Sequence, residues 1–234
     1  MLINEHRVAI LESVDIVSTV RLADLDRATP CEGWELVDLL AHMAVQHRGF
    51  AAAARGRGAD LGSWRVESVI GEVRRDPARA YTQAAHDVLD AFSTDGVDDA
   101  QFALPEFGDN AVFPGSVAMG FHFVDYVVHG WDVAASLGVG YELPAEVLTA
   151  AMPLVQAVPA GEIRLLDAVP FGPAIEPVDG GGDFDRILRH LGRRPQFKSR
   201  EASAARHPEG SGVAAMSRPT RSASRHSPEG TAAP

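Results

Sequence analysis

Two histidines and two aspartates recur at helical spacing in the segment 120–134. Separations of three, four and three residues place them along one stripe of a helix, in the order His122, Asp125, His129, Asp132. Phenylalanine and valine residues lie beside the stripe, so it is not a solvent-facing surface. Burying imidazoles and carboxylates is costly unless they pair or hold a metal ion. The stripe therefore indicates either a metal site or side chains that pair across a helix turn, for instance at a subunit contact.

A further histidine, His42, lies in the largely apolar stretch 36–54. It shares a helical face with Leu39 and lies close to Gln46. A lone histidine in such surroundings is more often a hydrogen-bonded core residue than a metal ligand. From the residues alone, both interpretations of His42 stay open.

The elements that must position these side chains are predicted to be helices. Apolar residues at three- and four-residue steps predict helices over 5–25 and 36–54. A third helix begins at Asp76 and Pro77, an N-cap followed by proline at the first helical position, and runs to Phe92. A fourth runs over 116–138. Long helices with a short first connection and longer later ones predict a mainly α four-helix bundle with a crossover connection.

Shorter elements are expected around this bundle. Two short extended pieces, 101–104 and 111–113, precede the fourth helix. After it, a small α/β cap is expected, and its elements are a helix over 144–158, a strand near 174–178 and a terminal helix over 183–191. The predicted organisation is a bundle at 1–140, a cap at 141–195 and a tail at 196–234.

Two segments resemble the signatures of one known family. The first signature of the mycothiol-dependent maleylpyruvate isomerase N-terminal family, part of the DinB-like superfamily, resembles Thr29-Pro-Cys-Glu-Gly-Trp-Glu-Leu-Val-Asp-Leu-Leu-Ala-His42. Its second signature is similar to Asp125-Tyr-Val-Val-His129-Gly-Trp-Asp-Val-Ala. The ending, from Phe171 to Pro195, resembles the closing segment of a metal-binding subfamily of unassigned function. The resemblance covers about residues 5–195.

This resemblance implies a bundle whose second and fourth helices supply a metal site of two histidines and one acidic residue. Carried onto this sequence, the ligands are His42, Asp125 and His129. Three protein ligands leave one position for water or substrate, as in catalytic rather than closed structural zinc sites. Zinc is the expected ion, and nickel, iron or manganese also suit this ligand set.

Other residues near the three candidate ligands are expected to position them or to assist the chemistry. His122 and Asp132 are expected beside the metal, where they orient an imidazole or act in catalysis by handling a proton. Trp34 and Trp131 are interpreted as packing residues that position the ligand helices. Cys31 is interpreted as a small packing residue, with a fourth ligand or a redox group as the alternatives.

The sequence departs from the family pattern at two positions. Glu35 stands where relatives often have Ser or Thr as the helix cap, which affects the start of the helix more than the chemistry. Asp125 is shorter than the glutamate of some relatives, so its reach to a metal depends on a closer approach of the two helices.

The family likeness favours a metal-dependent enzyme that uses mycothiol as co-substrate, as a transferase or isomerase of a small electrophilic metabolite. A metal-bound thiol is deprotonated near neutral pH, which is the chemical advantage of an open site. Two alternatives stay open: a thiol-independent Lewis-acid enzyme of specialised metabolism, such as a hydrolase or cyclase, and a non-catalytic metal-binding accessory protein. A monomer or a homodimer is expected.

Composition excludes several other classes of protein. The chain has 234 residues, of which 46% are hydrophobic and 23% charged, as in one globular domain with a short appendage. No apolar run approaches the ~20 residues of a membrane-spanning helix. Charged residues interrupt the first twenty positions, so no signal peptide is expected, and the single cysteine, Cys31, allows no internal disulfide. A cytoplasmic location is therefore expected.

The net charge of −11 is unevenly distributed. Residues 196–234 hold six Lys or Arg and three Glu, so the acidic excess lies in residues 1–195. An acidic body repels phosphate backbones, so nucleic acid is not expected as a partner. Without a long apolar run, a membrane is not expected as a partner either. The tail is rich in Ser, Ala, Pro and Gly with almost no large apolar side chain, and is expected to be disordered.

Overall fold

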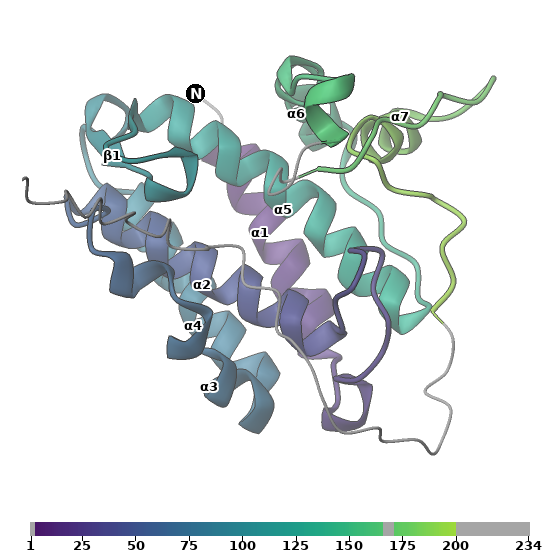
Figure 1. Ribbon diagram of the computed structural model, residues 1–234, viewed down its shortest axis with the longest axis horizontal. Helices are drawn as coiled ribbons and strands as arrows, with labels where there is room; N and C mark the ends of the chain where they lie inside the picture. Colours follow the sequence, from purple (N-terminus) through teal and green to yellow (C-terminus); the bar gives the residue numbers. More distant parts are fainter. Residues whose placement is uncertain (1–2, 166–170, 200–234) are drawn as a thin grey trace, which may run out of the picture. The chain divides into compact units, whose positions relative to one another are not determined.

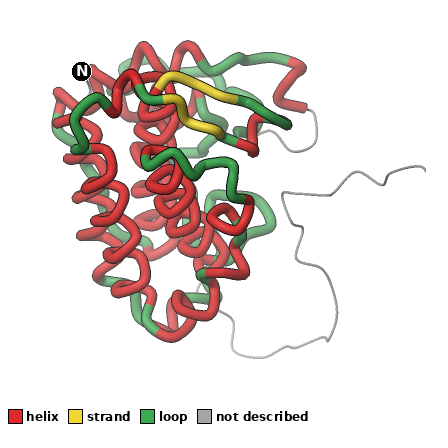
Figure 2. The backbone as a smooth tube through the Cα atoms, turned by 90° about the vertical axis from the view of Figure 1, so that its left-hand side faces the viewer, coloured by secondary structure: helices red, strands yellow, loops and turns green. Residues whose placement is uncertain are grey.

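The computed structural model describes residues 3–165 and 171–199, and this part of the chain is mainly helical (Figures 1 and 2). Four long helices hold most of its helical residues: α1 (Ile3–Ser18), α2 (Leu36–Ala54), α4 (Pro77–Phe92) and α5 (Gly115–Leu137). A short helix, α3 (Ile70–Arg75), precedes α4. No helix in the described ranges has the length and apolarity needed to cross a membrane.

The four long helices pack as a bundle in which each helix packs mainly against two of the others. Helix α1 packs against α4 and α5, and α2 packs against the same two helices. The consecutive helices α1 and α2 therefore lie diagonally across the bundle, as do α4 and α5. This arrangement confirms the mainly α bundle with a crossover that the sequence predicts.

Local hydrogen bonds explain where α2 begins despite the glutamate at its cap position. The backbone N–H of Glu35 donates to the Asp38 carboxylate at 3.1 Å. The next two N–H groups, of Leu36 and Val37, donate to carbonyl oxygens of the preceding connector, on Arg27 and Leu25. Since these donors already have acceptors, the missing Ser or Thr cap does not affect the start of the helix.

The first helix is shorter than its pattern predicts. It ends at Ser18 rather than at residue 25, and a 3-10 turn follows at Leu22–Asp24. The hydroxyls of Ser18 and Thr19 each donate to the carbonyl oxygen three residues earlier, which favours termination. Leu22, one of the apolar residues whose spacing predicts the longer helix, is exposed. By contrast, α4 begins as predicted, with the Asp76 carboxylate accepting from the Arg79 N–H at 3.1 Å.

A short hairpin precedes α5. Strands β1 (Gln101–Ala103) and β2 (Val112–Pro114) pair antiparallel, with Phe102 opposite Phe113. This confirms the two short extended pieces. A 3-10 turn at Pro105–Phe107 lies between the strands.

The C-terminal elements cover one side of the bundle. Helices α6 (Ala145–Ala157) and α7 (Asp183–His190) contact each other, and α6 also contacts α1 and α5. A strand at 174–178 is not present, because this segment makes no strand pairing in the described ranges and its Ile175 N–H donates instead to the Arg189 carbonyl at the end of α7. The predicted tail lies outside the described residues beyond 199, and the domain boundary at 140 stays a prediction.

Candidate metal centre

Three side chains predicted as metal ligands converge between α2 and α5. His42 Nε2 lies 3.9 Å from Asp125 Oδ2, and His129 Nε2 lies 3.2 Å from Asp125 Oδ1. One nitrogen or oxygen atom of each residue lies within 4.8 Å of those of the other two. The side chains of His42 and Asp125 are 22% and 23% exposed, whereas that of His129 is 6% exposed. The group is therefore partly open to solvent on the His42 and Asp125 side.

Helix geometry places these atoms. Asp125 and His129 are four residues apart on α5, so they share a face. His42 of α2 faces Asp125, and His47 of α2 faces His122 at 3.2 Å, so the two helices run antiparallel. The Trp34 ring packs 5.0 Å from the His42 ring. This contact supports the expected packing role of Trp34.

A glycine beside His129 has a packing reason. A Cβ atom at Gly130 would overlap the ring and hydroxyl of Tyr141, which lies in the segment after α5. The absence of a side chain at Gly130 lets the Tyr141 ring lie against the helix at this point. The glycine of the second signature thus serves close packing next to the site.

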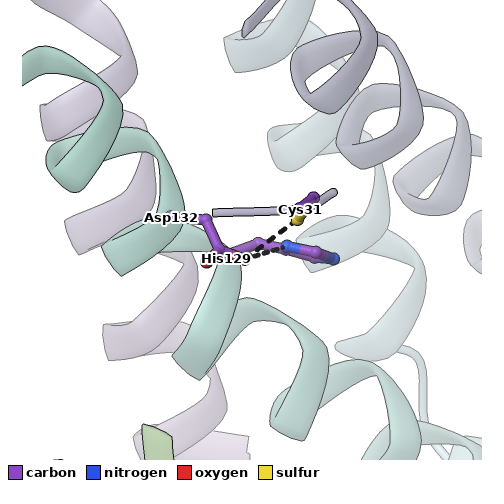
Figure 3. A group of neighbouring side chains, drawn as sticks. All are labelled: Cys31, His129 and Asp132. Carbon is purple, nitrogen blue, oxygen red and sulfur yellow. Dashed lines mark hydrogen bonds and ion pairs between the residues drawn. The ribbon is translucent and has the colours of Figure 1, made fainter. Parts of the chain in front are cut away.

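Asp132 supports His129 from the side opposite Asp125. The two residues are one turn apart on α5, and Figure 3 shows them together with Cys31. Asp132 Oδ2 lies 2.8 Å from His129 Nδ1. Because this carboxylate holds a proton on Nδ1, loss of the proton on Nε2 would leave a lone pair directed toward Asp125, which is the tautomer that a metal ligand requires.

Arg193, which follows α7, completes this buried group. Its Nη2 and Nε donate to the two Asp132 carboxylate oxygens at 2.8 and 3.1 Å. Cys31 donates from Sγ to Asp132 Oδ2 at 3.4 Å and accepts from Arg193 Nη2 at 3.3 Å. Cys31 therefore belongs to the contacts behind His129 and does more than pack.

The charges of this group stabilise one another. Burial alone would raise the pKa of Asp132, but Arg193 and His129 hold it well below its usual value. Burial also opposes protonation of His129, yet the carboxylates of Asp125 and Asp132 raise the pKa of His129 well above its usual value. The side chains of the centre thus form a set of mutually paired charged groups rather than a neutral pocket.

His122, the remaining member of the stripe, is not brought to this centre. Its Nδ1 lies 2.9 Å from His6 Nε2 and its Nε2 lies 3.2 Å from His47 Nδ1. All three imidazoles are buried, and His47 Nε2 has no hydrogen-bond partner among the described residues. A proton-handling role for His122 stays a prediction, and it would have to operate through His6 or His47.

Sequence reasoning missed Arg193 and the partners of His122. Arg193 lies in the closing segment that resembles the subfamily, which was the signal available for it. Its pairing with Asp132 joins residues 61 positions apart, and His6 and His122 are 116 positions apart. No local pattern predicts contacts at such separations.

Fold and site together define a helical-bundle protein with a candidate divalent-metal centre between two of its long helices. A family model described as the mycothiol maleylpyruvate isomerase N-terminal domain matches residues 7–134. The chain belongs to this family.

Individual proteins also resemble this chain, one in sequence and others in structure. An uncharacterised protein found in two strains of Mycobacterium tuberculosis is 28% identical over 150 residues, which cover 64% of this chain and 74% of that protein. A crystal structure of the mycothiol-dependent maleylpyruvate isomerase aligns with a TM-score of 0.57 at 14% identity, covering 88% of this chain and 94% of that one. A histidine-to-alanine mutant of the same enzyme gives 0.52 at 13% identity and covers 66% of each chain. The structural matches show a shared fold.

Proposed function

We propose that this protein is a metal-dependent enzyme that activates mycothiol at an open centre formed by His42, Asp125 and His129, and transfers or isomerises a small electrophilic metabolite. The observation that carries the proposal is the convergence of two imidazole nitrogens and one carboxylate on a partly exposed side of the α2–α5 contact. Family membership supports the choice of thiol.

The residues present fit a divalent ion. Donor atoms in tetrahedral zinc sites lie about 2.0–2.1 Å from the ion, which puts them about 3.3 Å from one another. The separations of 3.2 and 3.9 Å between Asp125 and the two imidazoles are close to that value. Zinc is the ion we propose, because borderline-soft zinc accepts imidazole, carboxylate and thiolate ligands.

When bound, the ion would lower the pKa of a thiol or water at the position that the three side chains leave free. The chain's own residues prepare that position. Asp132 fixes the proton of His129 on Nδ1 and acts as a positioning residue, while Arg193 balances the buried charge of Asp132. His42, from the facing helix, closes the third side of the ligand set.

Metal analysis of the purified full-length chain tests the ligand set. One divalent ion per chain is expected, and His42→Ala, Asp125→Ala and His129→Ala should each lower the metal content sharply. His86→Ala is the matched control, because His86 is an exposed histidine of α4. His47 is not a suitable control, since it belongs to the buried contacts of His122. Full metal retention in the double variant His42→Ala/His129→Ala would contradict the proposal.

Cobalt substitution tests the use of the thiol. Adding mycothiol to the cobalt form should produce a sulfur-to-metal charge-transfer band and release a proton, and Asp125→Ala should abolish the band. Absence of the band at millimolar mycothiol, combined with turnover of esters or electrophiles without any thiol, would favour the thiol-independent Lewis-acid enzyme instead.

A further inference from the structure

Three phenylalanines form an aromatic cluster on the surface next to the candidate metal centre. Phe107 stacks on Phe121 at 4.9 Å between ring centroids, and Phe113 lies 5.2 Å from Phe121 and 5.3 Å from Phe107. Phe107 is 48% exposed and Phe121 is 36% exposed. Contiguous aromatic rings left open to water commonly mark a binding surface.

The helix that carries Phe121 also carries a candidate metal ligand. Val117, Phe121 and Asp125 follow one another at four-residue steps on α5, and Val117 is also exposed. On α2, Gln46 lies one turn beyond His42. Because the two helices are antiparallel, Gln46 and Phe121 lie at the same level, one turn from the metal centre.

The 3-10 turn Pro105–Phe107 spans this level. Gln46 Nε2 donates to Glu106 Oε2 at 2.8 Å, while the neighbouring Phe107 stacks on Phe121. The turn therefore contacts α2 through a carboxylate and α5 through an aromatic ring. Glu106 itself is exposed, and partial desolvation raises its pKa to about 7.

We propose that the aromatic cluster of Phe107, Phe113 and Phe121 is the subsite for an apolar, preferably aromatic, group of the electrophilic substrate. This inference rests on the proposed function, because it places the reacting atom of that substrate at the metal centre one turn away. The structure thus assigns a substrate class: a small molecule with an uncharged, apolar arm.

Two observations favour this occupant over others. Three rings and a valine offer far less surface than the ~800 Å² that each partner commonly buries in a stable protein–protein interface. Among the described residues that contact the three candidate ligands or Asp132, the arginine is Arg193. Its guanidinium is already bonded to the Asp132 carboxylate. A charged group placed on the three rings themselves, one turn away from the metal ion, would therefore find no free cation among these contacts.

Two neutral thiols with the same two-carbon chain, one ending in a hydroxyl and the other in a phenyl ring, test the subsite on the cobalt-loaded full-length protein. The charge-transfer band reports binding of 2-mercaptoethanol and 2-phenylethanethiol in separate titrations. The phenyl compound should bind about tenfold more tightly or better, as expected for partial burial of one ring. Phe121→Ala and Phe107→Ala should each reduce that preference several-fold and leave the affinity for 2-mercaptoethanol unchanged. Leu22→Ala, at an exposed leucine outside the bundle contacts, should change neither value.

Equal affinity for the two thiols, or a preference that both phenylalanine variants retain, would overturn the subsite while leaving thiol activation intact. If neither thiol gives a band, the thiol-dependent function fails, and acetohydroxamate against benzohydroxamate repeats the comparison, because hydroxamates chelate the metal without thiol chemistry. If light scattering shows that Phe121→Ala converts a dimer to a monomer with no change in ligand preference, the cluster is an interface between copies and the inference is wrong.

Discussion

Asp132 does not face the open position of the centre, but it orients His129, which is one of the candidate ligands. Its carboxylate holds His129 at Nδ1, and such partners typically change metal affinity by about 10–100-fold when they are removed. Asp132→Asn should therefore weaken zinc binding by about that factor in a chelator competition, with His42, Asp125 and His129 all still present. An affinity equal to that of the unmodified protein, in a variant whose circular dichroism is unchanged, would contradict this role.

The Asp132–Arg193 pair should also matter for folding. Both side chains are buried, and removing one partner of a buried ion pair commonly costs about 3–5 kcal/mol because the other charge is left unpaired. Arg193→Met and Asp132→Asn should each lower the free energy of unfolding by an amount in this range. The double variant should lose much less than the two single losses added together. Urea unfolding of the four proteins measures this coupling, and additivity within about 0.5 kcal/mol would show that the two residues act independently.

At the scale of elements, the helices that carry the candidate ligands are predictable from sequence, and the contacts behind them are not. Period-3.6 spacing on α5 places Asp125 and His129 on one face from local information alone. The side on which His122 lies, toward His6 and His47, depends on how α1 and α2 pack against α5, which no single-helix pattern contains. The same limit explains why α1 is predicted too long, since local hydroxyl contacts at Ser18 and Thr19 end it.

Helices α1, α2 and α5 meet at the buried histidines His6, His47 and His122, and this contact should make stability depend on pH. Burial lowers the pKa of His6 to about 3 and holds the pKa values of His47 and His122 well below the usual value of a histidine. An unfolded chain takes up protons on these groups below about pH 6.5, whereas the folded chain does not. Stability should therefore be fully present above pH 6.5 and fall as the pH decreases, by about 1 kcal/mol per histidine between pH 7 and 5.5.

Urea unfolding at pH 7.5, 6.5 and 5.5 measures this loss. His42, whose pKa burial lowers to about 4, should add to it, and His129, whose pKa is raised, should oppose it. His6→Gln removes one titrating imidazole, so its stability should fall less steeply over the same interval. A free energy of unfolding that stays constant from pH 7.5 to 5.5 would refute the assignment of neutral buried imidazoles.

At the scale of the whole molecule, the centre draws on segments far beyond the helices that bear its ligands. Arg193 follows α7, and the apolar face of α5 at Phe123 and Val127 packs with Val147 of α6 and Ile187 of α7. The family match ends at residue 134, so these supports lie outside the part that it covers. A bundle reduced to residues 1–140 would keep the ligands and lose both the partner of Asp132 and this apolar cover.

Residues 200–234 should be dispensable for the site. They contain no Leu, Ile, Phe, Trp or Tyr, so their composition predicts little buried apolar area. Removing them should leave the melting temperature and the metal content nearly unchanged, as followed by calorimetry and metal analysis. A drop of many degrees in the melting temperature would show that this segment contributes to the folded core.

X-ray absorption at the zinc edge, recorded with and without mycothiol, shows directly whether the thiol binds to the metal. We expect a ligand shell of nitrogen and oxygen atoms with two imidazoles in the thiol-free protein, and one added sulfur at about 2.3 Å once mycothiol binds. A sulfur ligand already present without mycothiol would mean that Cys31 binds the metal. A shell that never acquires sulfur at saturating mycothiol would mean that the centre does not activate the thiol.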